Sequence, residues 1–141
     1  MTQCIDQTVT VLHVDDFEPW YRCARELLRV CPDWKIVATA CDGEEAVRKA
    51  TELQPDVILL DIGLPKLNGI EAARRIRNKC PRSQIVFLSQ QRDPDLTEAA
   101  LAIAGTRFVL KDHASSELVP AIAAALADEK STATLLQPTT Q

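Results

Sequence analysis

The sequence has no cysteine pattern that could cross-link a fold or bind zinc. Its five cysteines are an odd number and include no CxxC pair, which argues against a disulfide framework and a structural zinc site. They are Cys4, Cys23, Cys31, Cys41 and Cys80. We expect all five to be reduced thiols, as is usual in the cytoplasm.

The sequence also lacks a basic cluster and a long apolar run. It has 16 Lys and Arg against 20 Asp and Glu, and no patch of basic residues that could bind a nucleic-acid backbone. No stretch approaches the roughly 18 apolar residues of a membrane span, and the N-terminus does not resemble a signal peptide. We therefore expect a cytoplasmic protein that binds neither nucleic acid directly nor a membrane.

The chain does have the size and hydrophobic content of one globular domain. It contains 141 residues, of which 46% are hydrophobic. A domain of this size buries roughly 70% of the surface that its unfolded chain exposes. From Asp128 on, polar residues outnumber apolar ones, so we assign 1–130 to the domain and 131–141 to a polar tail or truncated linker.

Hydrophobic periodicity alternates between strand and helix along the chain. Short apolar runs predict strands at residues 9–14, 34–40, 56–60, 84–88 and 107–110. Apolar residues at helical spacing predict helices at residues 19–31, 44–53, 70–76 and 94–104, and a last one, capped by Ser115 or Ser116, that reaches residue 126. This alternation is typical of an α/β fold with a parallel sheet. The unbroken apolar run at 56–60 predicts a central strand that helices cover on both faces, hence three α/β/α layers.

Four of the predicted strands end in residues that can handle phosphate or a metal ion. Asp15 and Asp16 follow the first strand, Asp61 the third, Ser89 the fourth and Lys111 the fifth. The carboxyl ends of parallel strands share one edge of a sheet, where open α/β folds bind ligands, so these side chains should gather there. Singly, each is more often an ordinary turn residue. Together they predict a site for a divalent cation and a phosphoryl group.

Among these residues, Asp61 is expected to have the least favourable surroundings for a charge. It ends the most apolar strand, where an ionised carboxylate is costly unless it is paired. A carboxylate can attack phosphorus to form an aspartyl phosphate, and a bridging Mg²⁺ relieves the charge repulsion during attack. By contrast, we expect His13, Trp20 and Trp34 to be packing residues.

In order and spacing, these motifs resemble the receiver domains of bacterial response regulators in two-component signalling. The similarity covers residues 9–126 and includes the acid pair, the stretch 60–65 with Asn68-Gly69, and the strand ends at Ser89 and Lys111. Residues 70–77 look most like receivers attached to LuxR-type helix-turn-helix output domains. The resemblance implies a doubly wound, flavodoxin-like fold with five parallel strands in the order 2-1-3-4-5.

The resemblance also implies how the phosphoryl group is accepted and sensed. Asp61 would be the phosphoacceptor, with Ser89 and Lys111 binding the phosphoryl group. The donor would be a phosphohistidine on a sensor histidine kinase. Ser89 and Phe108 would form the switch that reshapes the face of the fourth helix, fifth strand and fifth helix. Candidate residues of that face are Glu98, Leu101, Arg107 and Phe108.

Two kinds of partner follow from a switched face of this type. We expect homodimerisation through the fourth helix, fifth strand and fifth helix, and either a DNA-binding output domain in a longer parent chain or, for a stand-alone receiver, a separate partner. The protein would then control transcription, and it would catalyse only its own phosphotransfer and slow autodephosphorylation. We therefore do not expect an enzyme that acts on an external substrate.

Metal binding and phosphoryl lifetime are implied for a further set of residues. Mg²⁺ or Mn²⁺ would be bound by Asp16, Asp61 and the backbone carbonyl of Gly63, with Asp15 acting through water. Gly63 and Gln91 stand where this family tunes dephosphorylation. Because Gly63 has no side chain, Gln91 would be the main local control.

Two further positions depart from the common pattern of the family. Gln90 replaces a small residue and would narrow access for the phosphoryl donor. Asp112 replaces a proline after Lys111, so no cis peptide is expected there, since a cis bond before another residue costs about 2.5–4 kcal/mol.

Two other classes of protein are alternatives to a receiver domain, an aspartate-dependent phosphohydrolase and a flavodoxin-like electron carrier. Phosphohydrolases of the haloacid dehalogenase superfamily place a second acid two residues beyond their nucleophile, and here that position is Gly63. A flavodoxin-like electron carrier needs a hydroxyl-rich phosphate loop after its first strand, where this chain has Asp15 and Asp16. Both alternatives fit the residues less well than a receiver.

Overall fold

A computed structural model of the protein describes residues 8–90 and 93–136, with side chains as far as residue 128. The strands are β1 (Val9–Val14), β2 (Trp34–Ala40), β3 (Val57–Asp61), β4 (Gln84–Ser89) and β5 (Thr106–Leu110). The helices are α1 (Pro19–Leu27), α2 (Gly43–Leu53), α3 (Gly69–Lys79), α4 (Pro94–Leu101) and α5 (Ala114–Leu136), with 3₁₀ turns η1 (Leu28–Val30) and η2 (Lys111–His113).

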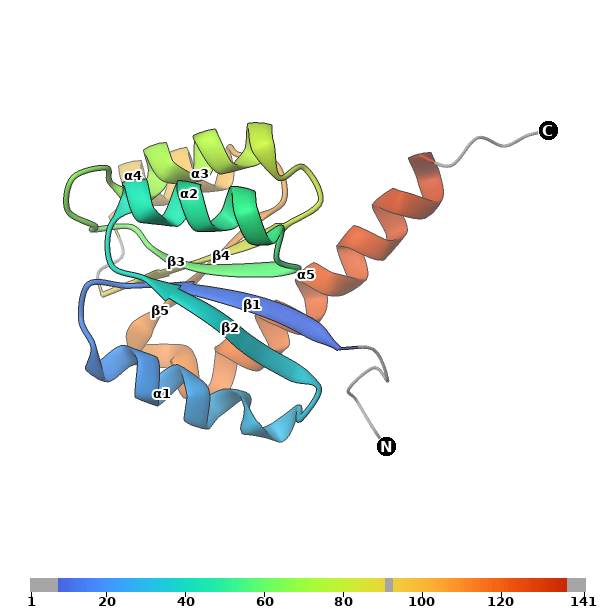
Figure 1. Ribbon diagram of the computed structural model, residues 1–141, viewed down its shortest axis with the longest axis horizontal. Coiled ribbons are helices and arrows are strands. Elements are labelled where there is room, and N and C mark those ends of the chain that lie inside the picture. The colour runs from blue at the N-terminus through green and yellow to red at the C-terminus, as the bar shows by residue number, and fades with distance from the viewer. Residues whose placement is uncertain (1–7, 91–92, 137–141) are drawn as a thin grey trace.

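The five strands form one parallel sheet in the order β2-β1-β3-β4-β5. Helices α2, α3 and α4 cover one face, and α1 and α5 cover the other (Figure 1). The predicted three-layer, doubly wound fold is therefore confirmed.

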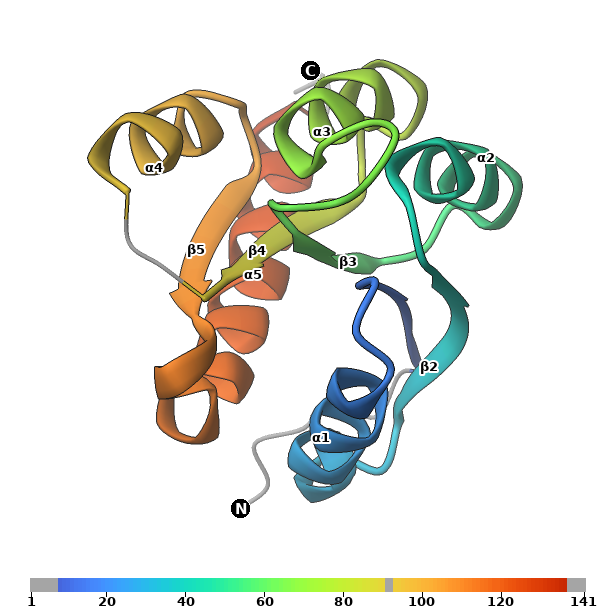
Figure 2. The same cartoon turned by 90° about the vertical axis from the view of Figure 1, so that its left-hand side faces the viewer.

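Strand β3 lies at the centre of the sheet because its side chains are apolar on both faces. Ile58 and Leu60 pack into the cluster under α2 and α3, whereas Val57 and Leu59 pack into the cluster over α1 and α5. All four residues are fully buried. Figure 2 looks onto the edge where the strands end, with the β1–α1 and β3–α3 connections in front.

Three of the helices that start at this edge, α2, α3 and α4, are capped by a side chain. The carboxylate of Asp42 accepts a hydrogen bond from the backbone of Glu45, and Asp93 caps α4 in the same way. The side chain of Asn68 caps α3, and Pro19 occupies the first turn of α1, where its missing N–H costs nothing. These local signals place four helix N-termini beside the strand ends.

Helix α4 is shorter than the sequence predicts. It ends at Leu101, three residues before the expected end at residue 104. The hydroxyl of Thr106 donates to the carbonyls of Ala100 and Ile103, at 3.0 and 2.8 Å. Gly105 then turns the chain into β5 with a φ of 72°. A capping residue from the next strand thus ends the helix.

Helix α5 differs from its prediction at both ends. It begins at Ala114, directly after η2, so the predicted cap at Ser115 or Ser116 is wrong. The hydroxyl of Ser116 instead donates to the carbonyl of His113 inside the first turn. At the other end, residues 131–136 continue the helix where a polar tail was expected, since they contain neither glycine nor proline.

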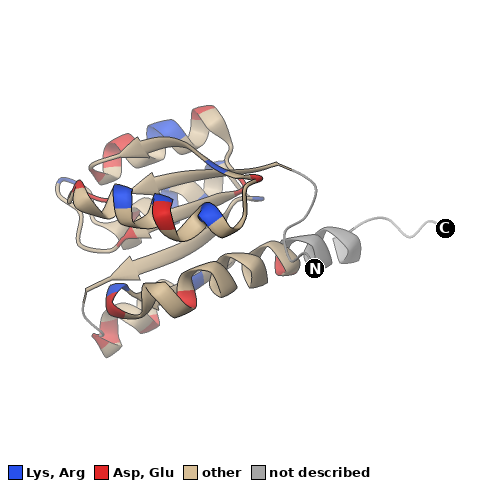
Figure 3. Ribbon diagram, turned by 90° about the horizontal axis from the view of Figure 1, so that it is seen from below, with Lys and Arg blue, Asp and Glu red and all other residues tan. Residues whose placement is uncertain are grey.

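Charge is distributed unevenly over the helices. Figure 3 shows α5 largely free of charged residues, and its residues 118–127 contain none. Within the described ranges, no helix combines the length and the apolarity needed to cross a membrane. The described backbone also contains no cis peptide bond, as expected for the bond between Lys111 and Asp112.

Candidate phosphoryl and metal site

The residues at the strand ends meet in a pocket of about 470 Å³ at the carboxyl edge of the sheet. Asp16, Asp61, Gly63, Ser89 and Lys111 line it. Phe17, Ile62, Gln90, Asp93 and Leu96 complete the lining. The predicted gathering of these groups is therefore confirmed.

Three carboxylates form the acidic part of this site. One oxygen each from Asp15, Asp16 and Asp61 lies within 4.8 Å of the others. Asp15 is fully buried, Asp61 is 8% exposed and Asp16 is exposed. A hard divalent cation prefers oxygen ligands of this kind, so the donor set fits Mg²⁺ or Mn²⁺.

Lys111 supplies the positive charge at the centre of the site. Its Nζ lies 2.7 Å from Oδ2 of Asp15 and 3.6 Å from Oδ2 of Asp61. The ammonium is placed by η2, immediately after β5, and the side chain is only 4% exposed. One ammonium offsets one of the three carboxylate charges, which leaves net negative charge for a cation to neutralise.

The surroundings of Asp61 disfavour its charged form. Burial raises its pKa above the usual value, and the charges of Asp15 and Asp16 raise it further. Lys111 and the N–H of Gly63, which donates to Oδ1 at 3.2 Å, lower it. A perturbed carboxylate in a pocket of this kind is typical of functional sites.

Asp15 is held rigidly below the pocket. Its Oδ1 accepts a hydrogen bond from the backbone N–H of Phe17 at 2.9 Å. The hydroxyl of Tyr21 donates to the carbonyl of Asp15 and, at 2.9 Å, to that of Ala40. Tyr21 therefore ties the ends of β1 and β2 together.

Trp20 and His13, expected to be packing residues, lie next to the site. The Trp20 ring has its centroid 5.1 Å from Nζ of Lys111. His13 is fully buried, and neither ring nitrogen has a hydrogen-bond partner. Burial, with the charges of Lys111 and Arg25, lowers its pKa to about 4, so the ring is neutral. In the sequence, the feature that could have indicated a role for Trp20 at the site is its position in the first helical turn after Asp15 and Asp16.

The predicted switch residues occupy different surroundings. Ser89 is half-buried and lines the pocket, whereas Phe108 is half-buried and lines a separate groove between α4, β5 and α5. Gln90 is exposed and lies at the pocket, as its suggested role in access requires. Gln91 lies outside the described residues.

Two glycines allow the β3–α3 loop to pack closely against its neighbours. A Cβ on Gly69 would lie 2.2 Å from the carbonyl oxygen of Asp61, and one on Gly43 would lie 1.8 Å from that of Leu67. Neither position has room for a side chain. The Asp42-Gly43 and Asn68-Gly69 pairs therefore combine a helix cap with a close backbone approach.

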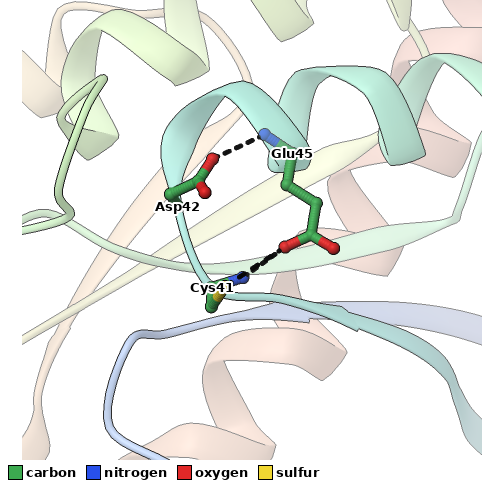
Figure 4. Close-up of side chains that lie close together, drawn as sticks. All are labelled: Cys41, Asp42 and Glu45. Carbon is green, nitrogen blue, oxygen red and sulfur yellow. Dashed lines mark hydrogen bonds between the residues drawn. The ribbon is translucent and has the colours of Figure 1, made fainter.

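A second group of potential metal ligands lies at the start of α2. Ligand atoms of Cys41, Asp42 and Glu45 also lie within 4.8 Å of one another (Figure 4). However, Glu45 accepts from the backbone N–H of Cys41 at 2.9 Å and pairs with Lys49 at 3.1 Å. Asp42 caps the helix and pairs with Lys66 at 3.6 Å. These oxygens are committed to helix capping and to cations.

Comparison with known proteins agrees with the site. The chain matches the response regulator receiver domain family over residues 11–123. The chain belongs to this family. It is therefore a phosphoacceptor module of two-component signalling, as its sequence predicts.

The relatives of this receiver domain differ in their output. The Thermotoga maritima protein-glutamate methylesterase/protein-glutamine glutaminase is 40% identical over 114 residues, which are 80% of this chain and 33% of that protein. The nitrate/nitrite response regulator protein NarL of Escherichia coli is 30% identical over 132 residues, which are 94% of this chain and 61% of that protein. The receiver domain thus spans a third to three fifths of these relatives.

Solved structures confirm the fold. A LuxR-family two-component response regulator from an Aurantimonas species superposes with a TM-score of 0.81 at 32% identity, over 86% of this chain and 87% of that chain. The response regulator domain of Thermotoga maritima CheB gives a TM-score of 0.70 at 36% identity, over 94% and 100%. The expected similarity to LuxR-type regulators is confirmed.

Proposed function

We propose that Asp61 is the residue on which this receiver domain accepts a phosphoryl group, from a phosphohistidine of a sensor histidine kinase. One observation carries the proposal. Asp61 is the only carboxylate among the described residues that combines a raised pKa with a place in the pocket beside both Lys111 and the acid pair. An oxygen of Asp61 forms the new bond to phosphorus while the bond from phosphorus to the histidine nitrogen breaks.

Each neighbouring residue has a part in this transfer. The N–H of Gly63 orients the Asp61 carboxylate, and the ammonium of Lys111 binds an oxygen of the incoming group. The Ser89 hydroxyl, on the lining of the same pocket, donates to another. These fixed charges act without reorganisation during the transfer.

The metal would be held by Asp16, Asp61 and the backbone carbonyl of Gly63, with Asp15 acting through water. A bound Mg²⁺ or Mn²⁺ neutralises the negative charge that builds up between carboxylate and phosphoryl group. Asp15 itself contributes through its buried ion pair with Lys111.

The response to phosphorylation would involve Ser89 and Phe108. Phe108 lines a groove of about 370 Å³ between α4, β5 and α5, so inward movement of its ring would reshape that face. Leu101 and Glu98 are exposed on α4, where they could contact a partner, and Arg107 pairs with Asp128 of α5. We propose that this face mediates homodimerisation or binds an output domain.

The output would be a separate partner protein or a further domain of a longer parent chain. The relatives support either a DNA-binding regulator, as in LuxR-type proteins, or an enzyme, as in the methylesterase. In both cases the receiver domain would act only on its own phosphoryl group, in the cytoplasm. Gln90 would restrict access, and Gly63 with Gln91 would set the lifetime of the phosphorylated state.

The direct test is the intact mass of the protein after incubation with acetyl phosphate and Mg²⁺. We expect a gain of one phosphoryl group, lost in Asp61→Asn and in the presence of a chelator. Asp33→Asn, which removes an acid at the opposite edge of the sheet, is the matched control and should behave like wild type. Equal phosphorylation of wild type and Asp61→Asn would refute the assignment.

A further inference from the structure

The first turn of α1 brings two consecutive aromatic residues under the buried ion pair of the site. Trp20 contacts the cation, with its ring centroid 5.1 Å from Nζ of Lys111. Tyr21 contacts the backbone of the residue that carries the anion, through the hydrogen bond from its hydroxyl to the backbone carbonyl of Asp15. Successive helical residues point in directions about 100° apart, which lets two neighbours reach both partners.

The position of the Lys111 ammonium matters because two carboxylates compete for it. It lies 2.7 Å from Asp15 and 3.6 Å from Asp61, so it is drawn to the carboxylate that does not react. A lysine has a flexible four-carbon stem, and an ion pair alone leaves it several rotamers. A ring face nearby attracts the ammonium and excludes water on that side.

Tyr21 supplies the matching restraint on Asp15. Besides its bond to Asp15, the hydroxyl donates to the carbonyl of Ala40, so it anchors β1 against β2. Its ring packs edge-to-face on the buried His13, with centroids 5.1 Å apart and an interplanar angle of 83°. The anion of the pair therefore has a fixed backbone, and Trp20 remains the contact that restrains the cation.

We propose that Trp20 is a positioning residue for phosphotransfer, which holds the ammonium of Lys111 between Asp15 and Asp61 before the phosphoryl group arrives. The inference rests on the proposed function of Asp61. A purely structural role is the alternative, since Trp20 also packs against the apolar cluster of α1 and α5. The two roles predict different effects of substitution.

The kinetic test compares Trp20→Leu, Trp20→Phe and Leu27→Ala with wild type. The rate of phosphorylation by acetyl phosphate is followed by intact mass, and Mg²⁺ affinity by the thermal unfolding midpoint against Mg²⁺ concentration. Trp20→Leu keeps apolar bulk without a π face, and we expect a rate about five- to ten-fold lower, given the usual strength of cation–π contacts. Trp20→Phe should recover most of the rate. Mg²⁺ affinity should change by less than about two-fold in both.

Leu27→Ala is the matched control, because Leu27 packs against the same cluster from the same helix, whereas the ring next to the Lys111 ammonium belongs to Trp20. It should lower stability and leave the rate unchanged. A wild-type rate in Trp20→Leu would overturn the proposal, as would a rate loss that is matched by Leu27→Ala or accompanied by an equal loss of Mg²⁺ affinity.

A second measurement needs no phosphoryl transfer and separates this inference from the proposed function. The ring current of Trp20 should shift the ε-methylene protons of Lys111 upfield in the proton NMR spectrum, relative to exposed lysines. The shift should vanish in Trp20→Leu and persist in part in Trp20→Phe. An unshifted Lys111 signal overturns the Trp20 proposal. An Asp61-independent mass gain, or none in wild type, overturns the proposed function instead.

Discussion

Two regions of this receiver domain bring three potential metal ligands together, and they have opposite electrostatics. Asp15, Asp16 and Asp61 meet at the ends of β1 and β3, and Cys41, Asp42 and Glu45 meet at the start of α2. In the pocket, burial raises the pKa of Asp61. At the helix, the backbone N–H of Cys41 lowers the pKa of Glu45 to about 2.

The difference lies in the partners that each carboxylate already has. At the helix, backbone N–H groups and two lysines satisfy the oxygens of Asp42 and Glu45. In the pocket, Asp15 and Asp61 share the ammonium of Lys111, and a ligand oxygen of Asp16 lies within 4.8 Å of theirs. Proximity of ligand atoms is common to both groups, whereas unmet negative charge is found only in the first. That excess charge is what a cation would neutralise.

The largest difference in unfolding free energy between the two clusters should come from substituting the lysine that each contains. Lys111→Met leaves the fully buried Asp15 uncompensated, and we expect a loss of about 3–5 kcal/mol in the free energy of unfolding. Lys66→Met removes a largely exposed cation from the helix cluster and should cost less than about 1 kcal/mol. Urea unfolding measures both. Similar losses would mean that burial does not distinguish the two clusters.

The second largest difference between the clusters should be their contribution to stabilisation by Mg²⁺. At a concentration about 100 times its dissociation constant, we expect it to raise the free energy of unfolding by about 2.7 kcal/mol. Asp61→Asn should abolish that increase and Glu45→Gln should leave it intact, since only the first removes a ligand of the proposed site. Urea titrations with and without Mg²⁺ provide the measurement. If Glu45→Gln abolished the effect, the metal site would belong at α2.

Without metal, Asp61→Asn should stabilise the protein near neutral pH by about 1 kcal/mol. The raised pKa means that the folded state disfavours the charged carboxylate, so stability falls as the pH rises through that pKa. The neutral amide removes this cost. Chelator-treated samples of both proteins, unfolded in urea at several pH values, should show a gap that closes in acid. A destabilised variant would contradict the assigned direction of the shift.

Glu45→Gln should have the opposite effect, a loss of about 1 kcal/mol near neutral pH after allowance for solvent screening. The pKa of about 2 in the folded state lies below the ordinary 4.5, so the contribution is present above pH 4.5 and is lost as the pH falls toward 2. Variant and wild type should therefore converge in acid. A constant difference at all pH values would point to packing instead.

The sheet and the inventory of the pocket could be read from the sequence with little error. The predicted strands at 9–14 and 34–40 have the observed bounds, and the other three differ by a residue at one or both ends. The reason is local, because the short length of these apolar runs and the turn residues that bound them favour a buried strand over a buried helix. Asp61, Ser89 and Lys111 were found because each follows such a run.

The helix ends required contacts that the local pattern does not contain. Thr106 ends α4 from the neighbouring strand, and the entry into α5 runs through η2 without a serine cap. Both depend on where the next element packs. Periodicity identifies the apolar face of a helix but leaves its last turns undetermined.

The sequence by itself determined the layered fold, the edge at which the site lies and the chemical types of its ligands, because strand burial and the parallel arrangement depend on local apolar patterns. Only the tertiary structure decided which acid cluster carries unmet charge and which aromatic residues support Lys111. Those properties arise from burial and from the contacts of Lys111 in η2 with Asp15 after β1 and Trp20 in α1, two residues that are far from Lys111 in the chain.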